Sequence, residues 1–309
     1  MKVKKQKIKT KGKSYPLQGC IFYKLSSKKR LEKILFTSIK ELQFLSNDIN
    51  YVLFYEKSDI NKKRLIEKPN EKLDIIHTRI ASLISRITQP QYMHSGLIDK
   101  SYISNAKQHL GKKPTLTTDI KSFFPSTTRQ KVFNFFYKKL CCSSDIADLL
   151  SLLCTINNHI PTGSRISMPL AYWANANMFN NLYAISCANN IIMTVYVDDI
   201  TFSGEKVNKQ FLSRVKKIIT SESHIMHPTK TILYSGTEIK KITGVIISND
   251  KLKVPNSLHN KIYLDIEEWK SLDNNENTAV KNRLLGRVYA AANIDNRFKD
   301  KARTIKKYV

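Results

Sequence analysis

Apolar positions along this chain follow two different spacings, and together they predict a mixture of helices and strands. Apolar residues three and four positions apart predict helices at 26–45, 71–87, 128–140, 143–156 and 169–190, and again after Pro255. Runs rich in β-branched residues predict strands at 51–56, 64–67, 115–120 and 191–197, and the alternating stretch 200–203 is typical of a return strand. The 309 residues can bury one large core or fill two or three subdomains.

Two adjacent acids, Asp198 and Asp199, separate the strand predicted at 191–197 from its return strand. This pattern predicts a hairpin with both carboxylates at its tip. Like charges placed so close repel each other unless a cation neutralises them, and a hard divalent cation with oxygen ligands suits them best. An Asp-Asp pair taken alone is more often an ordinary turn, so the metal-site hypothesis depends on its context.

A third acid, Asp119, supplies that context because it lies at the end of the strand predicted at 115–120. Two aromatic residues and a proline follow, which is unusual for a core strand but is explained if Asp119 points to the same cation site. Two metal ions held by carboxylates of neighbouring strands catalyse nucleotidyl transfer: one activates the attacking hydroxyl and the other stabilises the leaving pyrophosphate. The three acids together therefore predict a nucleotidyl-transfer site.

These residues resemble motifs of the reverse transcriptase family. Asp119 matches its first catalytic motif, and the run Tyr-Val-Asp-Asp at 196–199 matches its Tyr-x-Asp-Asp motif. The stretch 158–164 resembles the Pro-Gln-Gly loop, with Thr162 in place of the Gln. The stretch 227–231 resembles the motif whose Lys lies near the triphosphate, and 242–248 resembles the strand pair that grips the primer end. The resemblance covers most of the chain.

Two shorter elements resemble the retron reverse transcriptases in particular. The run Asn-Ala-Lys-Gln-His at 105–109 matches their Asn-Ala-x-x-His element, and Ile-Thr-Gly at 242–244 resembles their Val-Thr-Gly element, with Ile242 in place of Val. A single helical His is often a satisfied structural side chain. An RNA-binding role and a structural role therefore both stay open for His109.

The resemblance implies a role for each matching residue. Asp119, Asp198 and Asp199 would be catalytic and would hold two Mg²⁺ ions, with Mn²⁺ as a substitute and the backbone carbonyl of Ile120 as a further ligand. Phe124 would exclude a ribose 2′-hydroxyl; core packing is the alternative and suits Phe123 better. The remaining residues are nucleotide-binding Arg64, Phe124, Thr162, Gly163 and Lys230, primer- or template-binding Tyr196, Thr243 and Gly244, and RNA-binding Asn105, His109, Arg283 and Arg287. An exposed strand-edge charge is the alternative for Arg64.

By the same resemblance, the fold class is α+β with a right-hand polymerase architecture of fingers, antiparallel-sheet palm and helical thumb. The expected boundaries are a basic N-terminal tail at 1–13, fingers at 14–111, a palm with the catalytic site at 112–250 and a helical thumb at 251–309. Neither an RNase H nor an endonuclease domain is expected.

Composition indicates a polyanionic partner independently of any motif. Lys and Arg number 52 against 25 acids, a formal net charge of +27 that is typical of nucleic-acid binding. The first 13 residues include seven Lys, for which phosphate contacts and a solvated tail both stay open. There is no signal peptide, no long apolar span and no Cys-x-x-Cys spacing among the five Cys. We therefore expect no membrane partner and a location in the bacterial cytoplasm.

These observations favour a retron-type RNA-directed DNA polymerase. By resemblance, it would use dNTPs to copy a cognate structured non-coding RNA into RNA-linked single-stranded DNA (msDNA), primed from a guanosine 2′-hydroxyl, in an antiviral system with a separate effector protein. A group II intron-like or abortive-infection reverse transcriptase is an alternative within the class. A non-catalytic RNA-binding scaffold that keeps the palm is the alternative from another class.

Overall fold

The computed structural model describes residues 7–59, 62–248, 250–271 and 277–307, so the first six residues of the basic tail lie outside it. Its helices and antiparallel strands confirm the α+β class. The chain divides into two compact units, each built from separate stretches. Unit 1 consists of 1–91, 120–182 and 216–226, and unit 2 consists of 92–119, 183–215 and 227–309. The expected boundaries of fingers, palm and thumb stay a prediction.

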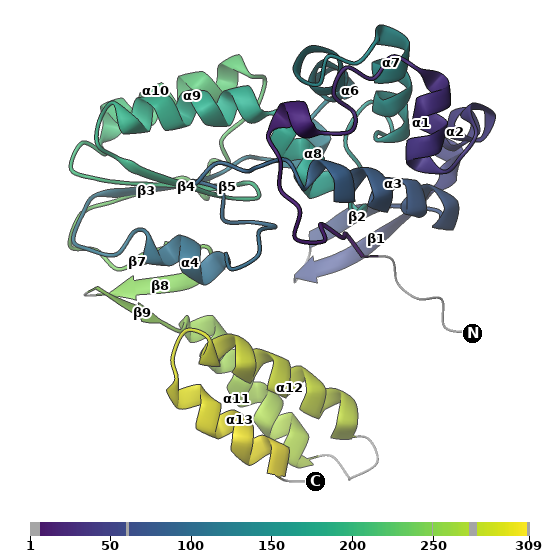
Figure 1. Ribbon diagram of the computed structural model, residues 1–309. Helices are drawn as coiled ribbons and strands as arrows, with labels where there is room; N and C mark the ends of the chain where they lie inside the picture. The colour runs from purple at the N-terminus through teal and green to yellow at the C-terminus, as the bar shows by residue number, and fades with distance from the viewer. Residues whose placement is uncertain (1–6, 60–61, 249, 272–276, 308–309) are drawn as a thin grey trace. The chain divides into compact units, whose positions relative to one another are not determined.

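Unit 1 combines one hairpin with many short helices (Figure 1). Strands β1 (Tyr51–Asp59) and β2 (Lys62–Pro69) pair antiparallel, as the runs at 51–56 and 64–67 predict. Its α-helices are α1 (Lys28–Leu35), α2 (Ile39–Leu45), α3 (Glu71–Ile84), α5 (Phe123–Ser126), α6 (Arg129–Asn134), α7 (Ser144–Leu153) and α8 (Ser167–Ala174). Its short turns are η1 (Leu17–Gly19), η2 (Asp48–Asn50) and the π-helical η3 (Phe135–Lys139). Helices α9 (Ala176–Cys187) and α10 (Lys209–Ser221) contribute residues to both units.

Unit 2 contains two antiparallel sheets and the short helix α4 (Tyr102–Lys107). The four-stranded sheet has the order β4 (Ile192–Tyr196), β5 (Asp199–Ser203), β3 (Thr115–Asp119) and β6 (Ile232–Tyr234). The three-stranded sheet has the order β7 (Lys240–Ile242), β8 (Val245–Ser248) and β9 (Lys251–Lys253). The first half of α10 lies on one side of the four-stranded sheet, and α4 and β7 lie on the other (Figure 1).

The four-stranded sheet has one apolar face and one polar face because side chains alternate along each strand. On the apolar face, the buried ring of Phe202 meets Phe211 of α10 at a centroid distance of 5.3 Å. On the other face, Thr117, Thr201 and Thr194 lie side by side in register. The acids at the ends of β3 and β5 lie two residues further along, on this polar face.

Helices α11 (Asn256–Ser271), α12 (Asn277–Ala292) and α13 (Arg297–Lys307) form the last described part of the chain. Their common core includes Ile262, Leu284, Val288 and Ile305, which confirms most of the apolar stripe predicted after Pro255. Leu264 is an exception and is 56% exposed. It follows Ile262 by two residues, which places it about 200° around the helix from the core.

Two helices that were predicted to be continuous are broken in the structure. After α1, Phe36 takes a left-handed conformation with φ 57, and Ser38 then caps the start of α2. The helix predicted at 169–190 breaks at the buried Asn175, whose amide donates to a main-chain carbonyl one turn earlier. Helical spacing does not report such side-chain bonds to the backbone, so it could not locate either break.

Candidate active site

The predicted acidic hairpin is present in unit 2. Strands β4 and β5 are joined by the two-residue turn Val197–Asp198, because Tyr196 pairs with Asp199. Val197 has φ 60, a left-handed conformation that a β-branched residue rarely adopts. Its main-chain N–H donates to Ser95 Oγ at 3.0 Å, so the turn is held from outside the hairpin. Backbone strain held by the surrounding structure is typical of functional sites.

Strand register brings the predicted catalytic acids together. Asp119 and Asp199 are direct antiparallel partners across β3 and β5, and Asp119 is 4% exposed. Burial first, and then the charges of Asp198 and Asp119, raise the pKa of Asp199 to about 6, although Lys230 acts to lower it. The three acids therefore concentrate negative charge at one end of the sheet.

Lys230 supplies a positive charge at this cluster. Its Nζ donates to Asp119 Oδ2 at 2.7 Å. The segment before it is joined to β3, because the N–H of His227 donates to the carbonyl of Asp119 at 2.7 Å and the hydroxyls of Thr231 and Thr118 lie 2.8 Å apart. Partial burial acts to lower the pKa of Lys230, but the hydrogen bond to Asp119 and the aspartate charges outweigh it and raise the pKa.

The chemistry of the acids suits a hard divalent cation. Asp119 and Asp199 offer carboxylate oxygens on neighbouring strands, with Asp198 one residue away, and such oxygens are the ligands that Mg²⁺ prefers. Burial and the charges of Asp198 and Asp119 raise the pKa of Asp199 by more than Lys230 lowers it. Within the described ranges, no three His, Cys, Asp or Glu side chains stand as a ready-made metal-holding group, and Lys230 engages one oxygen of Asp119. Metal binding would therefore require the ammonium group to leave that oxygen.

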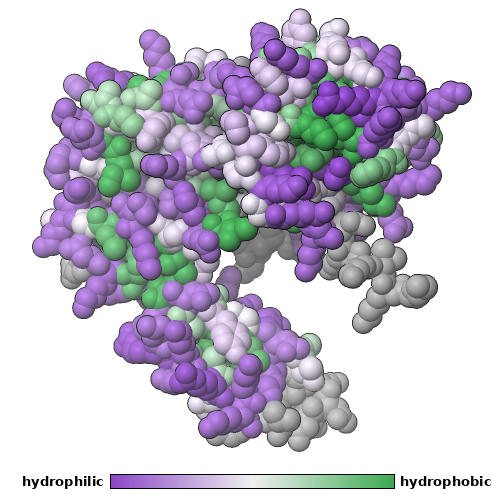
Figure 2. Space-filling view, viewed as in Figure 1, coloured by the Kyte–Doolittle hydropathy of each residue, from purple (hydrophilic) through white to green (hydrophobic). Residues whose placement is uncertain are grey.

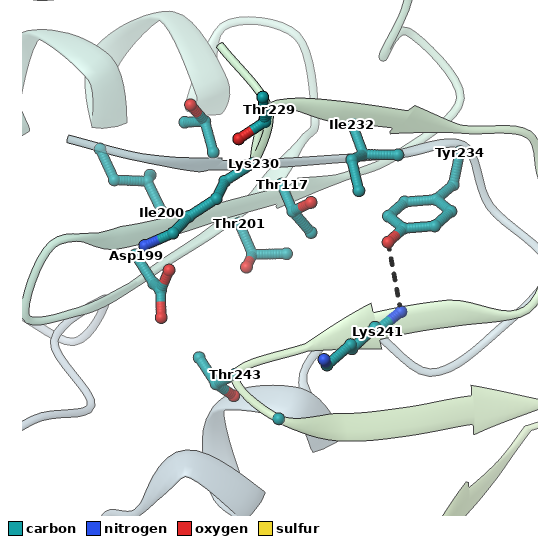
Figure 3. A pocket seen from close by; sticks show the side chains of 12 residues that line it. Thr117, Asp199, Ile200, Thr201, Thr229, Lys230, Ile232, Tyr234, Lys241 and Thr243 are labelled. Carbon is teal, nitrogen blue, oxygen red and sulfur yellow. Dashed lines mark hydrogen bonds between the residues drawn. The ribbon is translucent and has the colours of Figure 1, made fainter. Parts of the chain in front are cut away.

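A cavity of about 450 Å³ opens beside the acids (Figure 3). Asp199 and Lys230 lie at one end of it, and Thr117 and Thr201 line its floor on the polar face of the sheet. Thr243, from the turn between β7 and β8, lines the opposite side. The cavity can therefore hold a polar ligand next to the carboxylates.

Thr243 and Gly244, both predicted to bind primer or template, form the two-residue turn between β7 and β8. Their φ values of 45 and 82 are both positive, as in a type I′ hairpin turn. The hydroxyl of Thr243 donates to the carbonyl of Tyr102 at 2.9 Å and accepts from Asn105 Nδ2 at 3.4 Å. The structure thus places this turn and Asp199 on the walls of one cavity.

Asn105 and His109, predicted as RNA-binding, are 1% and 0% exposed. His109 Nδ1 lies 2.7 Å from Ser203 Oγ, and its Nε2 lies 2.7 Å from Thr194 Oγ1. Burial lowers the pKa of His109 to about 3, so the ring is neutral near pH 7. Of the two roles left open for His109, these contacts favour the structural one.

Arg283 and Arg287, also predicted as RNA-binding, pair with acids of α11. Arg283 Nε donates to Asp265 at 2.9 Å, and its guanidinium also pairs with Glu268. Arg287 Nη1 lies 2.6 Å from the same oxygen of Asp265, which is 2% exposed. Both arginines thus neutralise a buried carboxylate, and phosphate contact by either one stays a prediction.

In unit 1, Thr162 and Gly163 are held on strand β2, which also carries Arg64. The hydroxyl of Thr162 donates to the carbonyl of Leu65 at 2.8 Å, and its N–H donates to the buried carboxylate of Glu67 at 3.0 Å. A Cβ at Gly163 would lie 2.8 Å from the main-chain oxygen of Glu67, so a side chain does not fit there. The Thr162 hydroxyl is therefore engaged in hydrogen bonds with the main chain of β2.

The neighbours Phe123 and Phe124, also in unit 1, differ in their surroundings. Phe123 is 4% exposed and packs against Phe179 and His224, whereas Phe124 is half-buried. Helix α5, which carries both rings, is held by Ser126 Oγ at 2.8 Å from His224 Nδ1. Phe123 is therefore a core residue, and part of the Phe124 side chain remains accessible.

The curated proteins that the chain resembles are retron reverse transcriptases. It is 26% identical to the retron Ec86 enzyme of Escherichia coli over 232 residues, which are 73% of this chain and 72% of that enzyme. It is 24% identical to the retron Ec48 enzyme of E. coli over 290 residues, 85% of this chain and 71% of that enzyme. With the retron Se72 enzyme of Salmonella heidelberg it shares 32% identity over 180 residues, 56% of this chain and 47% of that enzyme. These similarities bear out the resemblance to retron reverse transcriptases that the sequence motifs suggested.

Among solved structures, a foamy viral protease–reverse transcriptase in complex with double-stranded DNA has a similar fold. The TM-score is 0.51 at 16% identity, over 99% of this chain and 47% of that one. This likeness confirms the reverse transcriptase fold. No protein-family model matches the chain.

The similarity to enzymes named reverse transcriptases supports the predicted enzyme class, RNA-directed DNA polymerase. In the part of the chain that the structure describes, no helix is both long and apolar enough to cross a membrane. Sequence reasoning missed Ser95, Glu67 and His224, which hold the acidic turn, the Thr162 loop and α5 respectively. Each acts through contacts with residues distant in sequence, so no local spacing could have indicated it.

Proposed function

We propose that this protein is a retron-type reverse transcriptase that copies a cognate structured RNA into RNA-linked single-stranded DNA by two-metal nucleotidyl transfer. The observation that carries the proposal is the register pairing of Asp119 with Asp199, with Asp198 alongside and a cavity that Asp199 lines. Burial and, after it, the charges of Asp198 and Asp119 raise the pKa of Asp199, so holding these carboxylates ionised together destabilises the fold. Such a cluster is therefore better explained by a bound cation than by folding.

Under this proposal the three acids would hold two Mg²⁺ ions, for which Mn²⁺ could substitute, with the carbonyl of Ile120 as a further ligand. When bound, the ions supply Lewis-acid activation of the attacking hydroxyl and neutralise the leaving pyrophosphate. Lys230, which donates to Asp119 in this structure, would then be free to donate to a phosphate oxygen. Tyr196 and the turn Thr243–Gly244 would contact the primer end, and Arg64 would contact the triphosphate.

The RNA partner is supported by the charge of the chain. The net charge is +27, and hydrophilic residues cover most of the face seen in Figure 2. Release of counterions from a polyanion makes such binding strongly salt-dependent, whereas a folded RNA is recognised by its shape and its unpaired bases. By resemblance, priming would start at a guanosine 2′-hydroxyl, and the product would act with a separate effector protein in antiviral defence in the bacterial cytoplasm.

Sequencing the nucleic acid that copurifies with the protein tests this function. We expect one predominant RNA with covalently attached DNA in the wild type, and the same RNA without DNA in the variant Asp198→Asn/Asp199→Asn. A wild type that carries RNA but never DNA would instead support the non-catalytic scaffold.

A pair of salt titrations tests the specificity. The RNA encoded beside the gene and a scrambled RNA of equal length should both bind more weakly as salt rises, but their affinities should diverge at moderate salt. If the two affinities fall together, the protein has no cognate RNA, and only the interpretation as a general polymerase remains.

Ribose selection gives a separate test of Phe124. Phe124→Val should raise the use of ribonucleotides relative to deoxyribonucleotides by about tenfold, because the ring no longer fills the space that a 2′-hydroxyl needs. Single-nucleotide incorporation measures the ratio, and Phe123→Leu is the matched control because that ring is buried. Unchanged selectivity in an active Phe124→Val enzyme would return Phe124 to core packing.

A further inference from the structure

Two short sequence elements that lie far apart in the chain meet at one hydroxyl group. The Thr243 hydroxyl, in the β7–β8 turn, donates to the carbonyl of Tyr102 and accepts from the amide of Asn105. Tyr102 and Asn105 both belong to helix α4. The turn that lines the cavity is therefore tied to α4 through a single side chain.

This connection matters because the turn is strained and accessible. Thr243 has φ 45, a left-handed conformation that is costly for a β-branched residue, so contacts outside the hairpin must hold it. Gly244 has φ 82, and a Cβ added there would meet no atom within 4 Å. The side of the turn that lines the cavity therefore leaves room for a ligand to approach the backbone.

Helix α4 is also joined to the strands that carry the acids. His109, just after α4, contacts Thr194 of β4 and Ser203 of β5, each at 2.7 Å. On its apolar side, Ile103 and Ala106 pack in one buried cluster with residues of β7 and β8. Helix α4 and the residues after it thus bridge the acidic hairpin and the Thr243–Gly244 turn.

Asn105 is not explained by stability alone. It is 1% exposed, and its Oδ1 has no hydrogen-bond partner among the described residues. A buried acceptor without a partner is destabilising, and an apolar side chain of similar size would remove that cost. The benefit of an amide here is the hydrogen that it donates to Thr243.

We propose that Asn105 is a positioning residue, which acts through the Thr243 hydroxyl to hold the Thr243–Gly244 turn in register with the acidic hairpin. It does not contact RNA. The Thr243–Gly244 turn then orients the primer end at the carboxylates, so the inference rests on the proposed polymerase function.

A double-mutant cycle tests the proposal with a defined RNA template, an annealed DNA primer and dNTPs. Asn105→Ala should lower the extension rate constant about tenfold, with the KM for dNTP and the affinity for the template–primer changed less than about twofold. Thr243→Val, which keeps the shape but loses the hydroxyl, should have a similar effect. Adding Asn105→Ala to Thr243→Val should cost less than about twofold more, because both changes remove one interaction.

Two control variants separate positioning from folding and from RNA contact. Thr243→Ser keeps the hydroxyl and should retain most of the rate. Asn105→Leu should be at least as stable as the wild type to heat, yet as slow as Asn105→Ala. Additive rate losses in the cycle, or a loss of template affinity in Asn105→Ala, would overturn the proposal. A loss of rate that follows a loss of thermal stability would also overturn it.

Hydrogen exchange keeps the test independent of activity. In Asn105→Ala, amides of 240–248 should exchange faster while those of 192–203 keep their protection. If the wild type makes no DNA, the proposed function fails, and this measurement still decides whether Asn105 holds the turn. Unchanged exchange at 240–248 would show that it does not.

Discussion

The two hairpin turns beside the cavity hold strained residues in different ways. Val197 in the β4–β5 turn and Thr243 in the β7–β8 turn are both β-branched with positive φ, 60 and 45 respectively. Val197 is held through its main-chain N–H, which donates to Ser95. Thr243 is held through its own hydroxyl, which bonds Tyr102 and Asn105.

The difference indicates what each turn tolerates. Any residue except proline at position 197 keeps an N–H for Ser95, whereas at position 243 only Ser or Thr keeps the hydroxyl. The acidic turn contains Asp198 and is followed directly by Asp199, whose pKa is raised to about 6, while Thr243 and Gly244 carry no ionisable side chain. We therefore expect the first turn to respond to charge and pH, and the second to the identity of one side chain.

Removing the charge of the acidic turn should have the largest effect. Asp198→Asn/Asp199→Asn should reduce DNA synthesis by more than about 1000-fold, because neutral amides cannot hold two divalent cations. Primer extension at saturating Mg²⁺ measures this, and Glu205→Gln, an exposed acid just after β5, is the matched control. Wild-type extension by the double variant would exclude the hairpin from the active site.

The same charge should make stability depend on pH in the metal-free protein. The folded-state pKa of Asp199, about 6, exceeds its ordinary value of 3.8. The native state therefore binds this proton more tightly than the unfolded state, and the group's contribution to stability falls as pH rises from about 4 to about 6. Above about pH 6, the ionised Asp199 destabilises the folded state to its full extent.

Asp199→Asn should remove this penalty. We expect a free energy of unfolding higher by about 1–2 kcal/mol at pH 7.5, after allowance for solvent screening, and no gain near pH 3.5. Urea unfolding in a chelator at the two pH values measures it, with Glu205→Gln again as control. An equal gain at both values would mean that ionisation of Asp199 is not the cause.

Removing the anchor of the acidic turn should have a smaller effect. Ser95→Ala deletes the acceptor for the Val197 N–H, which should cost about 1 kcal/mol in stability and slow extension several-fold. Ser95→Thr keeps a hydroxyl and should stay close to the wild type. Chemical unfolding measures the stability, and primer extension on the same preparations measures the rate. An unaffected Ser95→Ala would show that the turn keeps its conformation without the Ser95 hydrogen bond.

Glycine substitutions should give the smallest effects, with opposite signs in the two turns. Val197→Gly relieves the left-handed strain and keeps the N–H, so it should raise stability by up to about 1 kcal/mol. Thr243→Gly relieves similar strain but loses the hydroxyl bonds, so it should lower stability by up to about 1 kcal/mol. Thermal unfolding compares the two variants. Stability changes of the same sign would mean that the Val197 N–H and the Thr243 hydroxyl do not hold their turns in different ways.

The acidic site was predictable because its signals are local. A β-branched run, two acids and an alternating return run indicate a hairpin, and register then aligns Asp199 with the acid that ends β3. The β7–β8 pair with its turn at Thr243–Gly244, in contrast, was indicated only by the resemblance of 242–248 to the family's strand pair. Family resemblance added the roles of these residues, which spacing alone does not carry.

The sequence by itself therefore determined the mixture of helices and strands, the acids and the acidic hairpin, since these follow from neighbouring residues. Only the tertiary structure decided which partners those residues meet. It buried His109 between two strands, paired Arg283 and Arg287 with Asp265, and tied Thr243 to Asn105. Such contacts join positions from 18 to 138 residues apart. A local pattern indicates on which face of a helix or strand a side chain lies, but not which distant residues pack against that face.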